Sequence, residues 1–200
     1  MDKETGKPLL VNDKEVVATK TFVPTEAKGS VDLVYVVDAS ALEGKTVVVF
    51  EDLYINGKKV TSHADITDED QSVHFPKIRT SAVDKTTGFD ETLAKGEQTI
   101  VDTVSYWNLI VGEKYTVKGK LMDKSTGTAL LVNGKEVTVE KEFTADKVNG
   151  TINLEFTFDA SSLEGKTTVV FEDLYNSGVK VTTHSDIKDE AQTIRFPKVN

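Results

Sequence analysis

The amino-acid sequence predicts an all-β protein made of tandem antiparallel β-sandwich modules. Three observations support this prediction. Residues 1–79 return as residues 122–200 at a constant offset without a gap, so one module occurs twice. Runs of alternating apolar and polar residues fill both copies, while no sustained helical periodicity is present. Turn signals separate these runs at the spacing that is typical of a β-sandwich.

The repeat also predicts the module boundaries. Residues 80–121 occur only once, so the complete module comprises residues 80–200. Residues 1–79 are then the same module without its first third. A module of this size is long enough to bury its own hydrophobic core. We therefore expect an incomplete module at residues 1–79 and a complete module at residues 80–200.

In the first copy, residues 30–37 predict a strand. Every second residue from Val31 to Val37 is apolar, as a strand with one buried face requires. Asn56-Gly57 predicts a hairpin turn between two further runs. Asp13 stands where the second copy has glycine, and aspartate also tolerates a tight turn.

The single-copy segment and the second copy carry the same kind of signals. The alternate residues from Tyr115 to Leu121 share one apolar face, and residues 151–158 alternate in the same way. Residues 136–143 and 167–174 predict further strands, the latter rich in β-branched side chains. Asn133-Gly134 predicts a hairpin between two of these runs.

The charge and composition exclude several classes of function. The chain carries a formal charge of −9 with acidic residues spread along it, so nucleic acid and anionic membranes are poor partners. It contains no cysteine, which excludes disulfides and thiolate metal sites. No apolar run is long enough to span a membrane, and we expect no membrane insertion. Zinc-ligand spacings and phosphate-binding glycine loops are absent from the sequence, and we expect no metal and no cofactor.

Both copies share three polar features that could carry chemistry. They are a glutamate inside an apolar strand, a histidine twelve residues later and a glutamine eight residues after that: Glu51, His63 and Gln71 in the first copy, Glu172, His184 and Gln192 in the second. Each has an ordinary explanation, because strand glutamates usually face solvent and single histidines are usually surface or core residues. Taken alone, these residues indicate only a β-sandwich module of unknown function.

Longer motifs around these residues are more specific. Val-Val-Phe-Glu-Asp-Leu-Tyr at residues 169–175, Thr-Thr-His-Ser-Asp-Ile at 182–187 and Asp-Glu-Ala-Gln at 189–192 resemble the VaFE-type repeat domains of Gram-positive surface adhesins. Residues 78–84 look like the first strand of that family, and residues 101–109 look like its second. The resemblance spans residues 80–200, and its latter two thirds return in residues 1–79. It implies an immunoglobulin-like (CnaB-like) sandwich.

The resemblance also implies an intramolecular ester bond. A threonine on the first strand, Thr80 by motif position, attacks the side-chain amide of Gln192 on the last strand, and ammonia leaves. Asp102, Glu172 and His184 are the implied helpers. A threonine hydroxyl needs an adjacent base, for which His184 is the best candidate. A carboxyl kept protonated by burial could stabilise the oxyanion, and the division of roles between Asp102 and Glu172 stays open.

The first copy has no equivalent of Thr80 or Asp102, so we expect no intramolecular ester at Gln71. It could be disordered, partly folded, or completed by strands from another chain, whose threonine could then bond to Gln71. Residues 80–121 could instead serve the first copy. We disfavour this idea if the first and last strands run parallel, because too few residues separate Gln71 from Thr80 for a parallel crossover. The order of threonine before glutamine that the resemblance implies also favours Gln192.

The leading functional expectation is a structural stalk module of an extracellular, cell-wall-anchored adhesin, with neighbouring modules of the same protein as its partners. One alternative is a ligand-binding adhesin domain without a cross-link, whose sign would be an exposed aromatic patch at Tyr106, Trp107 or Phe89. A hydrolase using His184 and Glu172 ranks last. A group that its own reaction consumes cannot turn over, so we expect single-turnover cross-linking rather than an enzyme.

Overall fold

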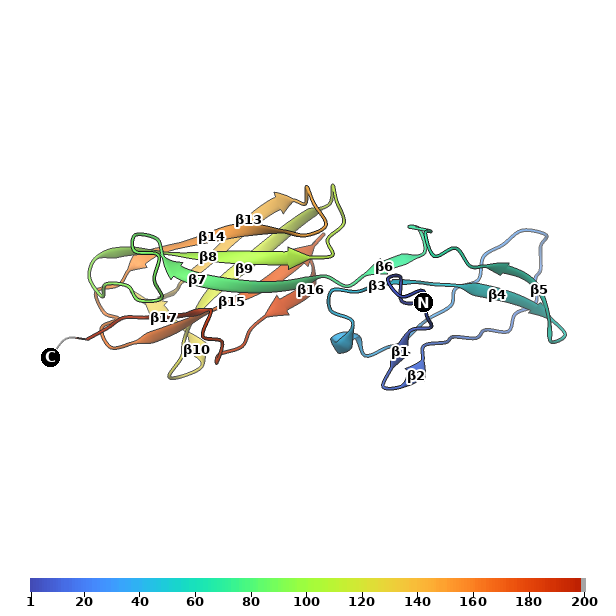
Figure 1. Ribbon diagram of the computed structural model, residues 1–200, viewed down its shortest axis with the longest axis horizontal. Coiled ribbons are helices and arrows are strands. Elements are labelled where there is room, and N and C mark those ends of the chain that lie inside the picture. The colour runs from blue at the N-terminus through green and yellow to red at the C-terminus, as the bar shows by residue number, and fades with distance from the viewer. Residues whose placement is uncertain (199–200) are drawn as a thin grey trace. The chain divides into compact units, whose positions relative to one another are not determined.

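The computed structural model describes residues 1–198, which form two compact units. The first unit extends from Met1 to Phe75, and the second begins at Pro76 (Figure 1). The boundary predicted between residues 79 and 80 falls inside the first strand of the second unit, β7 (Lys77–Asp84). Within residues 1–198, no helix is long and apolar enough to cross a membrane.

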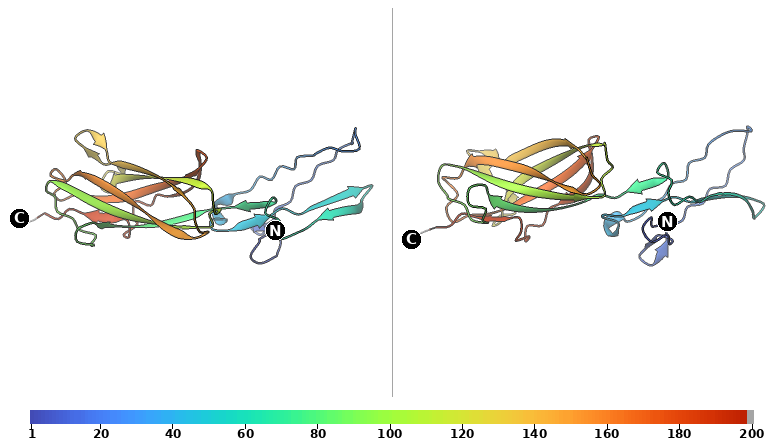
Figure 2. Two further views of the ribbon diagram at one scale, coloured as in Figure 1. Left: turned by 90° about the horizontal axis from the view of Figure 1, so that it is seen from above. Right: turned by 45° about the horizontal axis from the view of Figure 1, so that its top comes forward.

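The second unit is built around two large antiparallel sheets whose strands run along its length (Figure 2), with a separate two-stranded pair of β11 (Leu131–Val132) and β12 (Lys135–Glu136). One sheet has three strands in the order β14 (Gly150–Asp159), β8 (Glu97–Trp107), β7. The other sheet has six strands. Four of them lie in the order β10 (Thr128–Ala129), β9 (Lys114–Asp123), β15 (Thr167–Asn176) and β16 (Val179–His184). In addition, β13 (Thr138–Thr144) pairs with β9, and β17 (Thr193–Arg195) pairs with β15. The predicted all-β antiparallel fold is confirmed.

The core of the second unit lies between these sheets. The predicted alternation is seen in β9, where Tyr115, Val117 and Leu121 are buried, and in β14, where Leu154 and Phe156 are buried. Full burial of each large apolar side chain contributes about 1.5–3 kcal/mol. This single cluster holds the two sheets together.

Asparagine-led turns close the hairpins where the sequence predicts them. Asn133 and Gly134 have φ values of 51° and 75° between β11 (Leu131–Val132) and β12 (Lys135–Glu136). Positive φ at both central residues is the signature of a type I′ turn, which matches the twist of paired strands. In the first unit, Asp13 takes the position of this glycine at φ 61°.

The first unit contains only short pairs of strands. Three pairs form: β1 with β2, β3 with β6, and β4 with β5. Their bounds are β1 (Leu10–Val11), β2 (Lys14–Glu15), β3 (Thr46–Val48), β4 (Glu51–Ile55), β5 (Lys58–His63) and β6 (Ser72–His74), with one 3₁₀ turn at Ala39–Ala41. In the repeat, β3 and β4 correspond to the single strand β15 of the second unit.

The strand predicted at residues 30–37 is wrong. This segment lies in a long stretch without strands (Figure 2), and Val36 is 92% exposed. Its counterpart in the second unit is β14, which pairs along its full length with β8. The first unit has no counterpart of β8, so the backbone of residues 30–37 finds no partner strand. An alternating sequence is therefore insufficient without a neighbouring strand.

Candidate functional site

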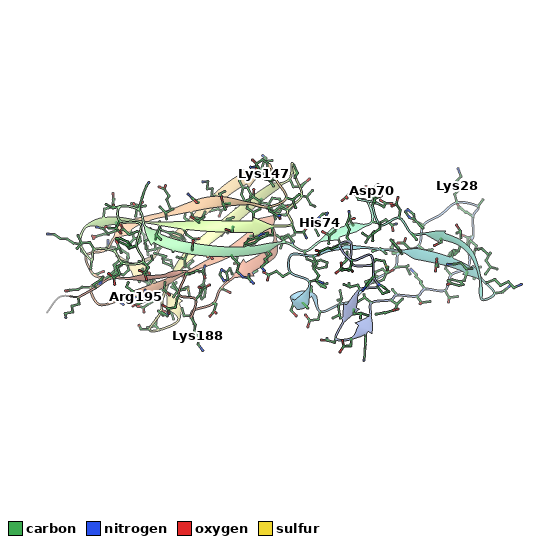
Figure 3. All side chains as sticks on the ribbon, viewed as in Figure 1. Lys28, Asp70, His74, Lys147, Lys188 and Arg195 are labelled. Carbon is green, nitrogen blue, oxygen red and sulfur yellow. The ribbon has the colours of Figure 1, made fainter. Side chains whose placement is uncertain are left out.

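The site predicted in the second unit lies where its first and last strands meet. Thr80 is in β7, and Gln192 immediately precedes β17, which ends at Arg195 (Figure 3). A backbone hydrogen bond from the Ala82 N–H to the Ala191 oxygen, 2.9 Å long, joins the two segments. Both side chains are buried, Gln192 completely. The topology therefore brings together two residues that are 112 positions apart in the sequence.

The Thr80 hydroxyl lies at the centre of the site. It accepts a hydrogen bond from Gln192 Nε2, donates to Glu172 Oε2 at 3.1 Å and lies 3.4 Å from His184 Nδ1. Gln192 Nε2 also donates to Glu172 Oε2 at 2.6 Å. Four of the five residues implied by the resemblance thus meet at a single hydroxyl, with the amide of Gln192 directly against it.

The β15–β16 hairpin explains the spacing between Glu172 and His184. These residues are directly opposite each other in the antiparallel pairing. Opposed side chains on one face of a sheet lie about 4.5–5.5 Å apart at Cβ. A glutamate and a histidine twelve residues apart are therefore brought side by side by one tight hairpin, and both face β7.

Asp102 interacts with the site through its neighbour Glu172. It lies in β8 opposite Ala82 of β7 and is fully buried. Burial raises the pKa of Asp102 to about 7, and burial together with the Asp102 charge raises the pKa of Glu172 well above its usual range. The two carboxyl groups lie close enough for each to affect the pKa of the other. Like charges so close cannot both be accommodated away from water, so the pair shares a proton near neutral pH.

Carboxylate oxygens without a hydrogen-bond donor support the presence of a shared proton. With both carboxyls ionised, neither oxygen of Asp102 nor Oε1 of Glu172 has a hydrogen-bond donor among the described residues, and Gln192 Oε1 is also without one. A buried polar atom without a partner costs about 1–3 kcal/mol. A proton held between the carboxyls removes part of that cost and leaves Glu172 as the neutral member, since its pKa is the one raised by the other's charge.

Asp189 is a site residue that the motif reading did not single out. Its Oδ2 lies 3.2 Å from His184 Nε2, on the side of the ring opposite Thr80. Its Oδ1 accepts the Ala191 N–H at 2.8 Å, which fixes the carboxylate in the turn that leads to Gln192. The available signal was its place five residues after His184 and three before Gln192. An activated hydroxyl needs a nucleophile, a base and a carboxylate that orients the base. Thr80, His184 and Asp189 are placed to fill these three roles.

The first unit contains half of this arrangement. Glu51 and His63 are opposite each other in β4 and β5, and His63 Nε2 lies 3.1 Å from Asp68 Oδ2. Gln71 follows Asp70 and leads into β6, which ends at His74 (Figure 3). Its backbone oxygen accepts the Val49 N–H at 3.0 Å, as the oxygen of Gln192 accepts that of Val170 at 3.1 Å. No residue of the first unit stands where Thr80 or Asp102 would be.

The aromatic residues weighed as a ligand patch do not form one. Tyr106 is buried and packs against Phe143 with ring centroids 5.4 Å apart. Trp107 is at the end of β8 that pairs with Lys77, whereas Phe89 follows the other end of β7. The three side chains therefore share no single exposed surface.

Comparisons with known proteins agree with this geometry. The family model "T-Q ester bond containing domain" matches residues 1–75 and again residues 76–196. Two crystal structures of a Mobiluncus mulieris adhesin containing intramolecular disulfide, isopeptide and ester bond cross-links are similar in fold, each with a TM-score of 0.51 and 17% identity. The matches cover 60% and 62% of this chain and 56% and 57% of the adhesin, so the chain spans little more than half its length. No curated protein matches significantly.

Proposed function

Since the chain belongs to the family of T-Q ester bond containing domains, we propose that its second unit is a stalk module of a bacterial surface adhesin, closed by a self-formed ester between Thr80 and Gln192. The observation that carries the proposal is the buried contact between the Thr80 hydroxyl and the Gln192 amide. The likeness to the Mobiluncus mulieris adhesin supports the setting.

The reaction begins with removal of a proton from Thr80. His184 Nδ1 accepts this proton, while Asp189 holds the opposite ring nitrogen and stabilises the charged imidazole. Thr80 Oγ1 then bonds to Cδ of Gln192. Folding has already placed the two groups in contact, which replaces a bimolecular encounter with an oriented one.

Departure of ammonia completes the exchange. The Cδ–Nε2 bond of Gln192 breaks, and the nitrogen leaves with one added proton. Glu172 Oε2 is 2.6 Å from that nitrogen, so neutral Glu172 is the proton donor and Asp102 is the partner that keeps it neutral. The proton taken by His184 replaces the one lost by Glu172. One hydroxyl and one amide thus become one ester and one ammonia, with no other reactant.

The reaction consumes its own nucleophile and its own electrophile. Each module therefore reacts once, and we assign it cross-link formation without turnover rather than an enzymatic activity. A stalk role also implies an extracellular location, attachment to the cell wall through other parts of the protein, and neighbouring modules as partners.

The ester suits a module under tension. It joins β7, where force enters, to the residue that precedes β17, where force leaves. Pulling then loads a covalent bond, and the strands between Thr80 and Gln192 need not unfold. By analogy with a disulfide closing a loop of this length, the cross-link also stabilises the fold by about 5 kcal/mol through loop-closure entropy.

Intact mass under denaturing conditions tests the proposal. The native chain is expected to lack the mass of one ammonia, and Thr80→Ala and Gln192→Ala are expected to show their full calculated masses. Ser81→Ala is the matched control, because Ser81 is next to Thr80 but exposed on the other side of β7. A native chain with its full calculated mass would remove the ester, as would a Thr80→Ala variant that still lacks one ammonia.

A further inference from the structure

The connection between β7 and β8, residues 85–96, lies against β17, the strand that follows Gln192. The Arg195 N–H donates to the Asp90 oxygen at 2.8 Å, and the Thr92 N–H donates to the Arg195 oxygen at 3.0 Å. On its other edge, β17 pairs with β15 over only three residues. The short strand that sets the position of Gln192 is therefore held from both sides, by β15 and by this connection.

Thr92 also bonds to β7. Its hydroxyl donates to Asp84 Oδ2 at 2.6 Å, against 3.4 Å to Gln98 Oε1, and both Thr92 and Asp84 are buried. Asp84 ends β7 and lies on the same buried face as Thr80. One residue thus contacts both reacting strands, through its hydroxyl the strand of the nucleophile and through its N–H the strand that follows the electrophile.

The turn at Asp84 does not need the bond from Thr92. Oδ1 of Asp84 alone accepts the hydrogen bonds of the turn. Asp123 begins the same Asp-Lys-x-Thr-Gly sequence, and its Oδ1 likewise accepts from Ser125 while its Oδ2 binds Lys166 at 2.7 Å. In both places one carboxylate oxygen forms the turn, and the other holds a distant segment.

The bond between Thr92 and Asp84 is of the stronger kind. Burial alone would raise the pKa of Asp84, but the hydrogen bonds from Thr92 and the turn outweigh burial and lower it. A buried hydrogen bond to an ionised acceptor is stronger than a neutral one. The ion pair of Arg195 with Asp90 (Figure 3 labels Arg195) also holds the connection, but its side chains are 39% and 53% exposed, and such pairs contribute little.

We propose that Thr92 is a positioning residue for ester formation, because it fixes β17 relative to β7 and so holds the Gln192 amide against the Thr80 hydroxyl. The backbone bond from Ala82 to Ala191 aligns the two segments at the site, and Thr92 aligns them beyond it. A displacement of about 1 Å between reacting groups can slow a reaction about 100-fold. This inference rests on the proposed function, since the reaction that Thr92 aligns is the proposed one.

The rate of ester formation tests this role. Complete chains are purified unfolded in urea and diluted into buffer. Tryptophan fluorescence then follows folding, and intact mass under denaturing conditions follows the loss of ammonia. Thr92→Val should fold but lose ammonia at least about tenfold more slowly than the native chain. Thr92→Ser keeps the hydroxyl and should stay within about threefold of the native rate.

Val137→Ala separates positioning from lost stability. Val137 is a buried core residue between β12 and β13, outside the connection and β17, and its truncation removes core packing. The stability of each variant is measured with Thr80→Ala added, so that no ester contributes. Val137→Ala should lose at least as much stability as Thr92→Val but keep the native rate of ammonia loss.

The outcomes separate this inference from the proposed function. A native chain that never loses ammonia would remove the proposed function. If the native chain loses ammonia and Thr92→Val folds and reacts equally fast, or Val137→Ala is slowed as much, the positioning role is overturned. If Thr92→Val does not fold, all variants are compared in trimethylamine N-oxide, which favours burial. A chain still unfolded there would make Thr92 a folding residue and also overturn the positioning role.

Discussion

Removing the ester should destabilise the second unit by an amount that depends on the length of the loop that the ester closes. Thr80 and Gln192 are 112 positions apart, and closing a loop of that length restricts the unfolded chain by about 5 kcal/mol. Thr80→Ala should lower the free energy of unfolding by about this amount. For a domain of this size, the corresponding fall in melting temperature is roughly 15–25 °C.

A double-mutant cycle isolates the cross-link from the ordinary cost of each substitution. Thr80→Ala and Gln192→Ala each remove the same bond, so the double variant loses it only once. The coupling energy between the two positions should therefore be about 5 kcal/mol, far above the roughly 0.5–3 kcal/mol of residues in non-covalent contact. Ser81→Ala should change stability by less than about 0.5 kcal/mol.

Guanidinium unfolding followed by tryptophan fluorescence suits this measurement. Trp107 is the only tryptophan in the sequence and lies in the second unit, so the signal reports that unit alone. Additive effects of the two substitutions, with a coupling energy under about 1 kcal/mol, would refute the loop-closure reasoning even if the mass deficit were present.

Three further predictions concern the pH response, the rate of ester formation and the open first unit. In Thr80→Ala, the free energy of unfolding should rise as pH falls from about 7 to 4, because folding raises the pKa of Asp102 and the folded state then binds the additional proton. Adding Asp102→Asn should flatten this rise. Asp189→Asn should slow the loss of ammonia by 10² to 10⁴, measured as a mass time course after purification. Trypsin should cleave after Lys20, outside any strand, before it cleaves after the equivalent Lys141 in β13.

Each of these has a contradicting result. If the free energy of unfolding of Thr80→Ala stays constant between pH 7 and 4, folding does not raise the pKa of Asp102 and the expected pH response is wrong. For the rate, Glu190→Gln is the control, because Glu190 is next to Asp189 but exposed and paired with Lys124. Equal rates of ammonia loss in Asp189→Asn and Glu190→Gln would show that Asp189 does not assist ester formation. Simultaneous cleavage after Lys20 and Lys141 would show that the first unit is as well protected as the second.

The sequence could predict those parts of the fold that depend on local pattern. Alternation identified β9 and β14, and Asn-Gly pairs identified the hairpins, because side-chain period and turn conformation are properties of short segments. The same reasoning failed for residues 30–37, which alternate as well as β14 does. What they lack is β8, and the presence of a partner strand is not encoded in the segment itself.

The candidate site was predictable in the same uneven way. The spacing of Glu172 and His184 is fixed by one hairpin, so a local motif is enough to place them together. Thr80, Gln192 and Asp102 meet through pairings between distant strands, and only the family resemblance suggested those. Asp189 was missed because an aspartate in a turn usually caps the turn. This one does so with Oδ1 while Oδ2 lies beside His184.

The burial of Gln192 has a consequence for the lifetime of the linkage. An ester exposed to water is open to hydrolysis, and this one would lie beside a histidine and a carboxylate able to activate water as readily as they activate threonine. Its protection therefore comes from the exclusion of water by the packed strands rather than from the bond itself. Cleavage would have to wait for local opening of the sandwich, so the durability of the covalent link would be governed by how rarely β7 separates from the segment before β17.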